Sequence, residues 1–148
     1  MVPISTERNT PTPASVWQRV RRGVLAALFP RYWMAVIEQE PLRLVLSSDG
    51  RVVTADGTAR RIHTVDKVLA VFDAVQSIDV VRHPAVAADG KPEHWSVSLY
   101  LGRSRRAFIG RSRKLKQATH AADLLARITG KSVRTLEVIG PDSHIPSR

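Results

Sequence analysis

The sequence predicts a small, mostly β domain of the α+β class, with about seven antiparallel strands in a bent, barrel-like sheet capped by a C-terminal helix. Three observations support this prediction. Short segments of alternating apolar and polar residues follow one another between residues 33 and 110. Asp-Gly pairs separate several of these segments, as they do in β-hairpins. One segment with helical periodicity, residues 115–129, closes the series, and 148 residues with 43% hydrophobic content suit one compact domain.

The N-terminal region has two parts of different composition. Residues 1–15 are polar and contain three prolines, which predicts a disordered arm. Residues 16–29 predict an amphipathic helix, which packs on its own domain or on a partner, or lies on an anionic membrane surface. Its candidate membrane-binding or partner-binding residues are Trp17, Val20, Val24 and Leu28 on one side and the cations Arg19 and Arg22 on the other. The apolar run is interrupted by Pro30 and is too short to span a bilayer.

The first predicted strands are short and separated by turn residues. They cover residues 33–37, 42–48 and 51–55, with Asp49-Gly50 as a two-residue hairpin turn and Asp56-Gly57 as a second turn. Residues 64–75 fit either a helix that begins at Thr64 or a strand. We favour the strand, because this segment is short, rich in Val and flanked by other strands.

The remaining strands cover residues 74–82, 95–101 and 105–110. Residues 95–101 show the clearest alternation, which points Trp95, Val97 and Leu99 inward and Ser96 and Ser98 outward. A twelve-residue loop, residues 83–94, precedes this strand, and residues 102–105 form the next turn. On the following strand, the aromatic ring of Phe108 is expected to point into the core.

The predicted closing helix, residues 115–129, has one apolar side and one polar side. Gly130 follows it, where a helix C-cap glycine is expected. Its apolar stripe consists of Leu115, Ala118, Ala121, Ala122, Leu125 and Ile128. We expect this stripe to pack on the sheet face that carries Trp95, Val97 and Leu99. Residues 135–148 are expected to form a loose tail.

The layout from about residue 42 to 133 resembles small bacterial pleckstrin-homology-like proteins. The resemblance lies in FDAVQSIDVV leading to WSVSLYL, then RRAFIG, then a helix that ends in ARITGKSV. It implies a bent sheet closed at one end by the C-terminal helix, within a domain of residues 33–134. It implies no lipid-headgroup residues, because residues 38–41 read Glu-Gln-Glu-Pro where the family places its binding cations.

The residue pattern does not indicate catalytic chemistry, so we expect neither an enzyme nor a cofactor. Cysteine is absent, and the five histidines are dispersed without helical pairing, which argues against a metal site. His83 and His94 flank the long loop and could converge, but no third ligand lies nearby in the sequence. Three aspartates on or beside predicted strands indicate turn and edge polarity more strongly than an acid/base pair, namely Asp66, Asp73 and Asp79.

The charge distribution gives the strongest functional signal. The formal net charge is +10, and residues 101–134 hold ten Lys or Arg and a single acid, Asp123. The candidate anion-binding residues are Arg103, Arg105, Arg106, Arg111, Arg113, Lys114 and Lys116. These cations predict a binding module for an anionic surface, foremost the inner membrane leaflet, in a cytoplasmic protein that attaches peripherally. The alternatives are a nucleic-acid-binding protein and a protein-protein assembly domain with an acidic partner, and the sequence does not indicate an oligomeric state.

Overall fold

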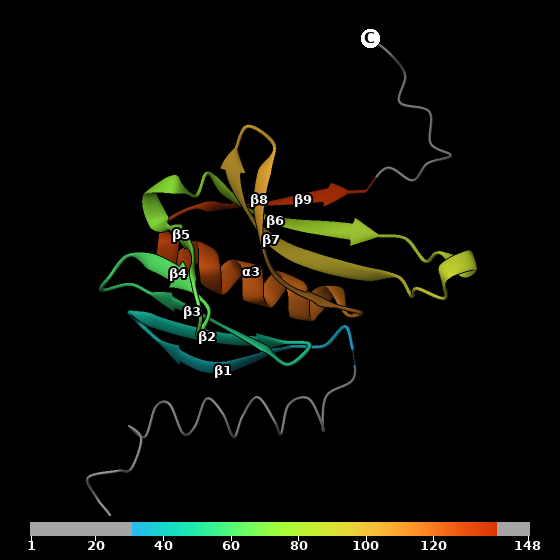
Figure 1. Cartoon of the computed structure of the whole chain (residues 1–148), viewed down its shortest axis with the longest axis horizontal. Coiled ribbons are helices and arrows are strands. Elements are labelled where there is room, and N and C mark those ends of the chain that lie inside the picture. Colours follow the sequence, from blue (N-terminus) through green and yellow to red (C-terminus); the bar gives the residue numbers. More distant parts are fainter. Residues whose placement is uncertain (1–30, 139–148) are drawn as a thin grey trace, which may run out of the picture.

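The computed structural model describes residues 31–138, which form two β-sheets and one α-helix (Figure 1). The first sheet is an antiparallel meander in the order β1-β2-β3-β4-β5. Its strands are β1 (Met34–Glu40), β2 (Arg43–Ser48), β3 (Arg51–Asp56), β4 (Arg61–His63) and β5 (Val68–Val71). A single 3-10 turn, η1 (Phe72–Ala74), leads out of this sheet.

The second sheet has the order β8-β7-β6-β9 and includes one parallel pair, β6 with β9. Its strands are β6 (Ser77–His83), β7 (His94–Gly102), β8 (Arg105–Ser112) and β9 (Ser132–Glu137). The short 3-10 helix η2 (Ala87–Asp89) lies in the loop between β6 and β7. The helix α3 (Leu115–Thr129) joins β8 to β9, which is why β9 can run parallel to β6.

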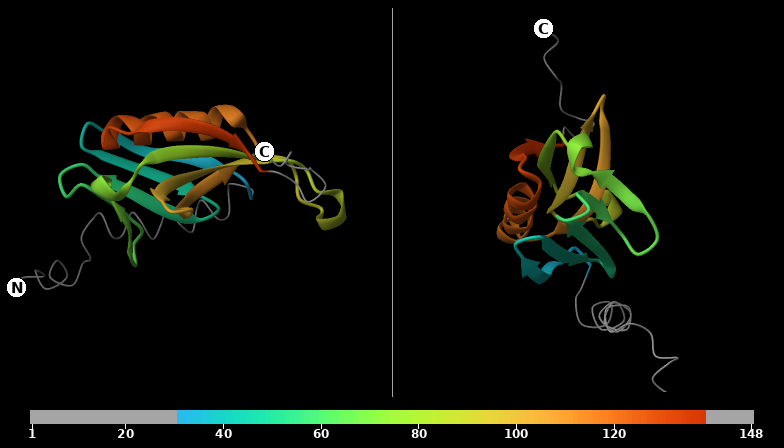
Figure 2. Two further views of the ribbon diagram at one scale, coloured as in Figure 1. Left: turned by 90° about the horizontal axis from the view of Figure 1, so that it is seen from above. Right: turned by 90° about the vertical axis from the view of Figure 1, so that its left-hand side faces the viewer.

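Helix α3 packs against strands of both sheets, and the core lies where the three meet (Figures 1 and 2). Its alanines Ala118, Ala121 and Ala122 are fully buried, and so is Leu125. These small side chains let the helix approach the sheets closely. The core also contains Ile78, Val80, Val97, Leu99, Phe72 and Ile62. The expected packing of the Leu125 stripe on the Val97 and Leu99 face is therefore confirmed.

The two sheets also contact each other directly where β8 meets β1 and β2. Gly110 of β8 allows this approach, because a Cβ atom there would lie 2.5 Å from Cβ of Ser48 and 2.6 Å from Cε of Met34. The Oγ of Ser48 accepts a hydrogen bond from the Arg111 amide at 2.9 Å and donates one to the Arg111 carbonyl at 3.1 Å. This junction fixes the position of β8 relative to the first sheet.

Several local predictions are confirmed by the backbone. Asp49 and Gly50 form a two-residue turn with φ of +52° and +79°, as a type I′ hairpin requires. Gly130 ends α3 with φ of +74°, and its amide bonds to the carbonyl of Ala126 at 2.8 Å. The α+β class and the closing helix are likewise present.

The sheets are open, so the predicted barrel-like closure is wrong. The edge of β6 that could accept β5 is occupied by β9, which pairs with it from Ser77 to Arg82. Nine strands are present among residues 31–138, more than the seven expected. Strand β9 continues to Glu137, so residues 135–137 belong to the second sheet rather than to a loose tail. The predicted arm, residues 1–15, and the predicted amphipathic helix, residues 16–29, lie outside the described residues.

Three further expectations need correction. Residues 64–75 form a strand only at β5, and the 3-10 turn η1 follows it. The side chain of Phe108 is 44% exposed, because a β-bulge opposite Val97 and Ser98 shifts the alternation of β8. Leu115 is also 44% exposed, although its position in the apolar stripe predicts burial. It is the first residue of α3 and lies beyond the edge of the core.

Candidate functional site

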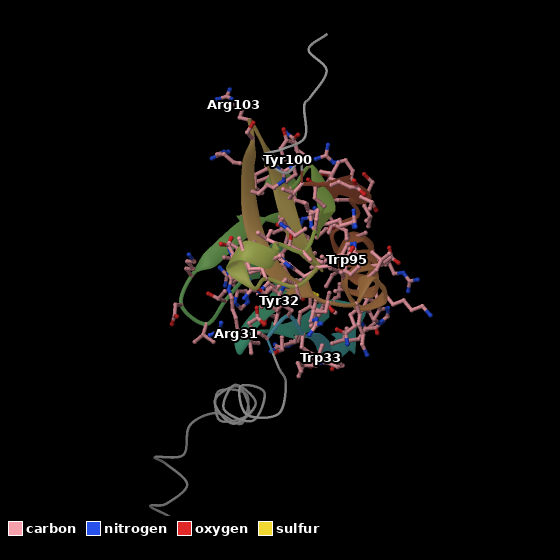
Figure 3. All side chains as sticks on the ribbon, turned by 90° about the vertical axis from the view of Figure 1, so that its right-hand side faces the viewer. Arg31, Tyr32, Trp33, Trp95, Tyr100 and Arg103 are labelled. Atoms are coloured by element: carbon pink, nitrogen blue, oxygen red, sulfur yellow. The ribbon has the colours of Figure 1, made fainter. Side chains whose placement is uncertain are left out.

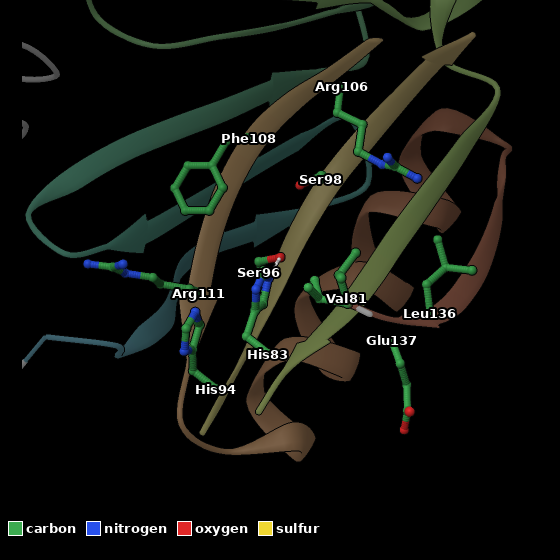
Figure 4. A pocket seen from close by; sticks show the side chains of 11 residues that line it. Val81, His83, His94, Ser96, Ser98, Arg106, Phe108, Arg111, Leu136 and Glu137 are labelled. Atoms are coloured by element: carbon green, nitrogen blue, oxygen red, sulfur yellow. Dashed lines mark hydrogen bonds between the residues drawn. The ribbon is translucent and has the colours of Figure 1, made fainter. Parts of the chain in front are cut away.

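A groove of about 610 Å³ runs across the second sheet on the face opposite to α3 (Figure 4). Alternation along β6 and β7 places their groove side chains, since the neighbouring positions point into the core, and the bulge in β8 brings Phe108 and Arg111 to the same face. The lining residues are Val81 and His83 of β6, His94, Ser96 and Ser98 of β7, Arg106, Phe108 and Arg111 of β8, and Leu136, Glu137 and Val138. The groove thus combines two guanidinium groups, two hydroxyls and two imidazoles with an apolar floor.

Two imidazole rings stack at one end of the groove, and a tyrosine ring lies tilted against one of them. The rings of His83 and His94 lie 4.5 Å apart and 3° from parallel, and Tyr32 lies 4.6 Å from His94. A hydrogen bond of 2.8 Å joins Nε2 of His83 to Oγ of Ser96. Burial lowers the pKa of His83, and the charges of His94 and Arg111 lower it further. The lowered pKa favours the uncharged form of His83, which suits the stacked arrangement.

A buried carboxylate lies on the same sheet face as the groove. Asp79 is fully buried and accepts hydrogen bonds from Nε and Nη2 of Arg134 at 2.9 and 2.8 Å. It also accepts bonds from Ser77 at 2.8 Å and from Arg106 at 3.2 and 3.3 Å. Burial acts to raise the pKa of Asp79, but the bonds from Arg134, Ser77 and Arg106 outweigh it and hold the pKa below its usual value. The guanidinium carbons of Arg106 and Arg134 lie 5.3 and 4.8 Å from the ring centre of Tyr100.

The structure does not gather the seven predicted anion-binding residues into one patch. Arg103 and Arg105 lie at the tip of the β7–β8 hairpin, which projects from the body of the molecule (Figure 3). Arg106 and Arg111, on β8, each pair with a carboxylate. The other three, Arg113, Lys114 and Lys116, are exposed where α3 begins. The hairpin tip and the start of α3 are separated by the length of β8, roughly 25 Å at about 3.3 Å per residue.

The pairing of Arg111 leaves its charge largely neutralised. Its Nε lies 2.5 Å from Oδ2 of Asp49, and its guanidinium carbon lies 4.0 Å from the ring centre of Tyr32. Arg106 also pairs with Asp79, but Asp79 is shared with Arg134, so this single carboxylate offsets only one of the two guanidinium charges. Hence Arg111 is not a free anion receptor, whereas Arg106, whose side chain is 41% exposed, keeps part of its charge on the groove side.

The start of α3 forms a second surface feature, which we call the basic corner. It consists of Arg31, Trp33, Arg113, Lys114, Leu115 and Lys116. The amide of Arg113 donates to the carbonyl of Tyr32 at 2.9 Å, which fixes residues 31–33 beside the helix. The Nζ of Lys114 lies 5.1 Å from the ring centre of Trp33. Figure 3 shows Arg31, Tyr32 and Trp33 at the end of the molecule opposite to Arg103.

Sequence reasoning missed parts of this site for identifiable reasons. It raised the convergence of His83 and His94 but did not indicate Tyr32 as a third ring. It did not connect Asp79 with Arg134, because the two residues face each other only through the parallel β6–β9 pairing. The candidate membrane-binding residues Trp17, Val20, Val24, Leu28, Arg19 and Arg22 lie outside the described residues.

Comparisons with known proteins add no assignment, since no family model, curated protein or solved structure matches this chain. Across residues 31–138, no helix has the length and apolar character to cross a membrane. The same residues contain no group of three or more His, Asp or Glu side chains placed to hold a metal ion.

Proposed function

We propose that this protein is a non-enzymatic binding module that attaches to the anionic inner leaflet of the membrane through the basic corner. The carrying observation is that four cations lie at or beside the start of α3, where the apolar side chain of Leu115 is also exposed. Arg31, Arg113, Lys114 and Lys116 take part in none of the ion pairs formed among residues 31–138. Unbalanced like charge raises the energy of the folded chain, so an anionic partner is the natural complement.

The apolar residues of the basic corner favour a membrane over nucleic acid. Leu115 is 44% exposed between Lys114 and Lys116, and the half-buried ring of Trp33 lies beside them. Trp is enriched at the level of the lipid headgroups, where an apolar ring and cations are both favourable. Each cation near an anionic leaflet contributes about 1 kcal/mol. The resemblance to pleckstrin-homology-like proteins fits this role but names no lipid-binding residue.

Nucleic acid is the second candidate, and one observation favours it. Phe108 is 44% exposed in the groove, with Arg51 5.7 Å from its ring centre and Arg106 on the same strand. An exposed ring beside guanidinium groups is the kind of surface on which a base can stack. A single ring is a small platform, so we rank this function below membrane attachment. An acidic protein partner is the third candidate.

Co-sedimentation with lipid vesicles tests the membrane proposal. The parent should bind vesicles that contain phosphatidylserine and should not bind neutral phosphatidylcholine vesicles. The triple variant Arg113→Gln, Lys114→Gln, Lys116→Gln should lose roughly a hundredfold in partition coefficient, since three cations contribute about 3 kcal/mol together. Its melting temperature should stay close to that of the parent, because exposed charges contribute little to folding.

The matched control is the double variant Arg103→Gln, Arg105→Gln at the hairpin tip. It removes exposed cations from the far end of β8 and should leave vesicle binding nearly unchanged. A loss of about thirtyfold in the double variant, as expected for two cations at about 1 kcal/mol each, would show that net charge alone drives binding and would reject the basic corner as the attachment site. Binding to duplex DNA but not to vesicles would establish the nucleic-acid alternative.

A further inference from the structure

The groove on the second sheet exists because β7, a strand inside the sheet, carries small side chains on the face opposite to α3. These side chains are Ser96 and Ser98 (Figure 4). Cross-strand pairing sets Ser98 opposite Phe108 of β8 and Ser96 opposite Val81 of β6. Small residues between larger ones leave a trough along β7, and its floor from Ser96 to Ser98 is roughly 7 Å long at about 3.4 Å per residue.

Polar groups close the trough at both ends. At one end the Arg106 side chain crosses from β8 towards β6, where its Nε and Nη2 donate to Oδ2 of Asp79 at 3.3 and 3.2 Å (Figure 4). At the other end lie the stacked imidazoles of His83 and His94. The trough is therefore bounded along its length, and its volume of about 610 Å³ lies in the range of small-molecule sites.

Arg106 keeps positive charge for a ligand. Asp79 accepts its shorter hydrogen bonds, 2.9 and 2.8 Å, from Arg134, so one carboxylate serves two guanidinium groups and one positive charge in this cluster is not balanced. The Arg106 side chain is 41% exposed, and its Nη1 donates to no group among residues 31–138. A ligand with a single negative charge matches this balance, because Glu137, which also lines the groove, would repel a second charge.

Two further groups in the trough can contact a ligand. The hydroxyl of Ser98 makes no hydrogen bond with any residue in the described part of the chain. Phe108, which pairs with Ser98 across the strands, is 44% exposed. On the other side of the trough, Val81 and Leu136 pair between β6 and β9 and provide an apolar wall. A hydroxyl that can donate to an oxyanion thus lies beside surfaces that can hold a flat apolar ring.

We propose that this groove is the binding site for a small aromatic monocarboxylate. The carboxylate accepts hydrogen bonds from Nη1 of Arg106 and Oγ of Ser98, and charge assistance makes the first of these the stronger. The aromatic ring packs between Phe108 and the wall formed by Val81 and Leu136. This binding site shares no residue with the basic corner, so it is independent of attachment to a membrane.

Amide NMR titration of the full-length protein with cinnamate tests this proposal. Cinnamate should shift the amide resonances of Ser98 and Phe108. It should bind at least about tenfold more tightly than the neutral cinnamyl alcohol, which cannot form a charged pair with a guanidinium. Because Arg106 also holds Asp79, this comparison removes the charge from the ligand and leaves the fold intact. Acetate, which lacks the ring, should cause no such shifts at the same concentration.

Two variants locate the contacts within the groove. Phe108→Ala and Ser98→Ala should each weaken cinnamate binding by roughly tenfold, because they remove the ring contact and the hydroxyl donor. Neither side chain belongs to the core cluster, so melting temperatures should stay near that of the parent. The matched control is Val71→Ala, which truncates a side chain that is 50% exposed on the first sheet and should leave cinnamate binding unchanged.

The proposal is overturned if cinnamate and cinnamyl alcohol bind equally well, or if a folded Phe108→Ala protein binds cinnamate as the parent does. It is also overturned if the triple variant of the basic corner loses cinnamate binding, since the probe would then follow surface charge. Displacement of cinnamate from the groove by a single-stranded DNA oligonucleotide at lower concentration would overturn it in favour of nucleic acid. None of these outcomes involves lipid, so the result is separate from the membrane proposal.

Discussion

Asp79 shows how this sheet keeps a carboxylate without exposing it to solvent. Two arginines from different strands and one serine hydroxyl complete its hydrogen bonds, and Tyr100 covers the guanidinium groups. A buried charge that lost these partners would cost several kcal/mol. The group therefore ties β9 to β6 and β8, and it makes the outer face of the second sheet sensitive to substitution.

We expect Asp79→Asn to destabilise the protein on the order of 2–3 kcal/mol, because both guanidinium groups lose their charged acceptor. Chemical denaturation at neutral pH measures this loss. Asp73→Asn is the control, since Asp73 pairs with Arg60 in an ion pair whose side chains are 84% and 61% exposed, and it should change stability little. Equal destabilisation by the two variants would contradict the special role of Asp79.

The lowered pKa of Asp79 also determines how the stability of the folded protein changes with pH. Asp79 loses its proton at lower pH in the folded state than in the unfolded state. The stabilisation of the fold by the ionised carboxylate is therefore fully present above the unfolded pKa, about 4. This contribution is lost as the pH falls through the folded pKa. The stability gap between parent and Asp79→Asn should accordingly narrow in acid, and a gap that widens there would contradict the assignment.

Single residues also show which local features could be predicted from the sequence and which could not. Strict alternation counted back from Arg111 points Phe108 inward, but the bulge in β8 turns both residues to the same face. Bulges depend on how two sheets meet, here at Gly110, and so they leave no local signal. The hairpin turn at Asp49-Gly50 and the C-cap at Gly130 were predictable because their backbone angles are local requirements.

At the scale of elements, strands β1, β2 and β3 and helix α3 followed from periodicity, whereas β4 and β9 did not. Residues 132–137 contain only Val133 and Leu136 as apolar side chains, which is typical of an edge strand. Their strand conformation comes from parallel pairing with β6. The candidate groove could not be predicted from the sequence either. Its lining comes from four strands, and their order in the sheet includes the non-local pairing of β6 with β9.

Helix α3 provides the element-scale prediction. Leu125→Ala should destabilise the domain by about 2–5 kcal/mol, since Leu125 is fully buried between the sheets. Leu115→Ala, in the same helix but 44% exposed, should leave the unfolding free energy nearly unchanged. Thermal and chemical denaturation of both variants checks this contrast. A Leu125→Ala protein as stable as the parent would show that α3 does not carry the core.

For the molecule as a whole, the net charge does not distinguish cations that pair with carboxylates from cations that are exposed. Of the seven predicted anion-binding residues, Arg106 and Arg111 are held by Asp79 and Asp49. Replacing them would disturb folding, so tests of anion binding should leave them intact. The remaining five lie at two ends of β8, and only the group at the start of α3 has apolar side chains beside it.

Because the cations at the start of α3 lie beside apolar side chains, we can predict how the binding of vesicles responds to salt. If the basic corner contacts a membrane, affinity for phosphatidylserine vesicles should fall with salt and then level off, because burial of Leu115 and Trp33 is not screened. Leu115→Ala should lower that salt-resistant remainder without changing the initial slope. If the same four cations contact DNA phosphates instead, the logarithm of affinity should fall linearly with the logarithm of salt, with a slope of about −3.6. A vesicle affinity that vanishes at high salt in the parent, with Leu115→Ala indistinguishable from it, would mean that the corner binds by charge alone and that its apolar residues do not enter the membrane.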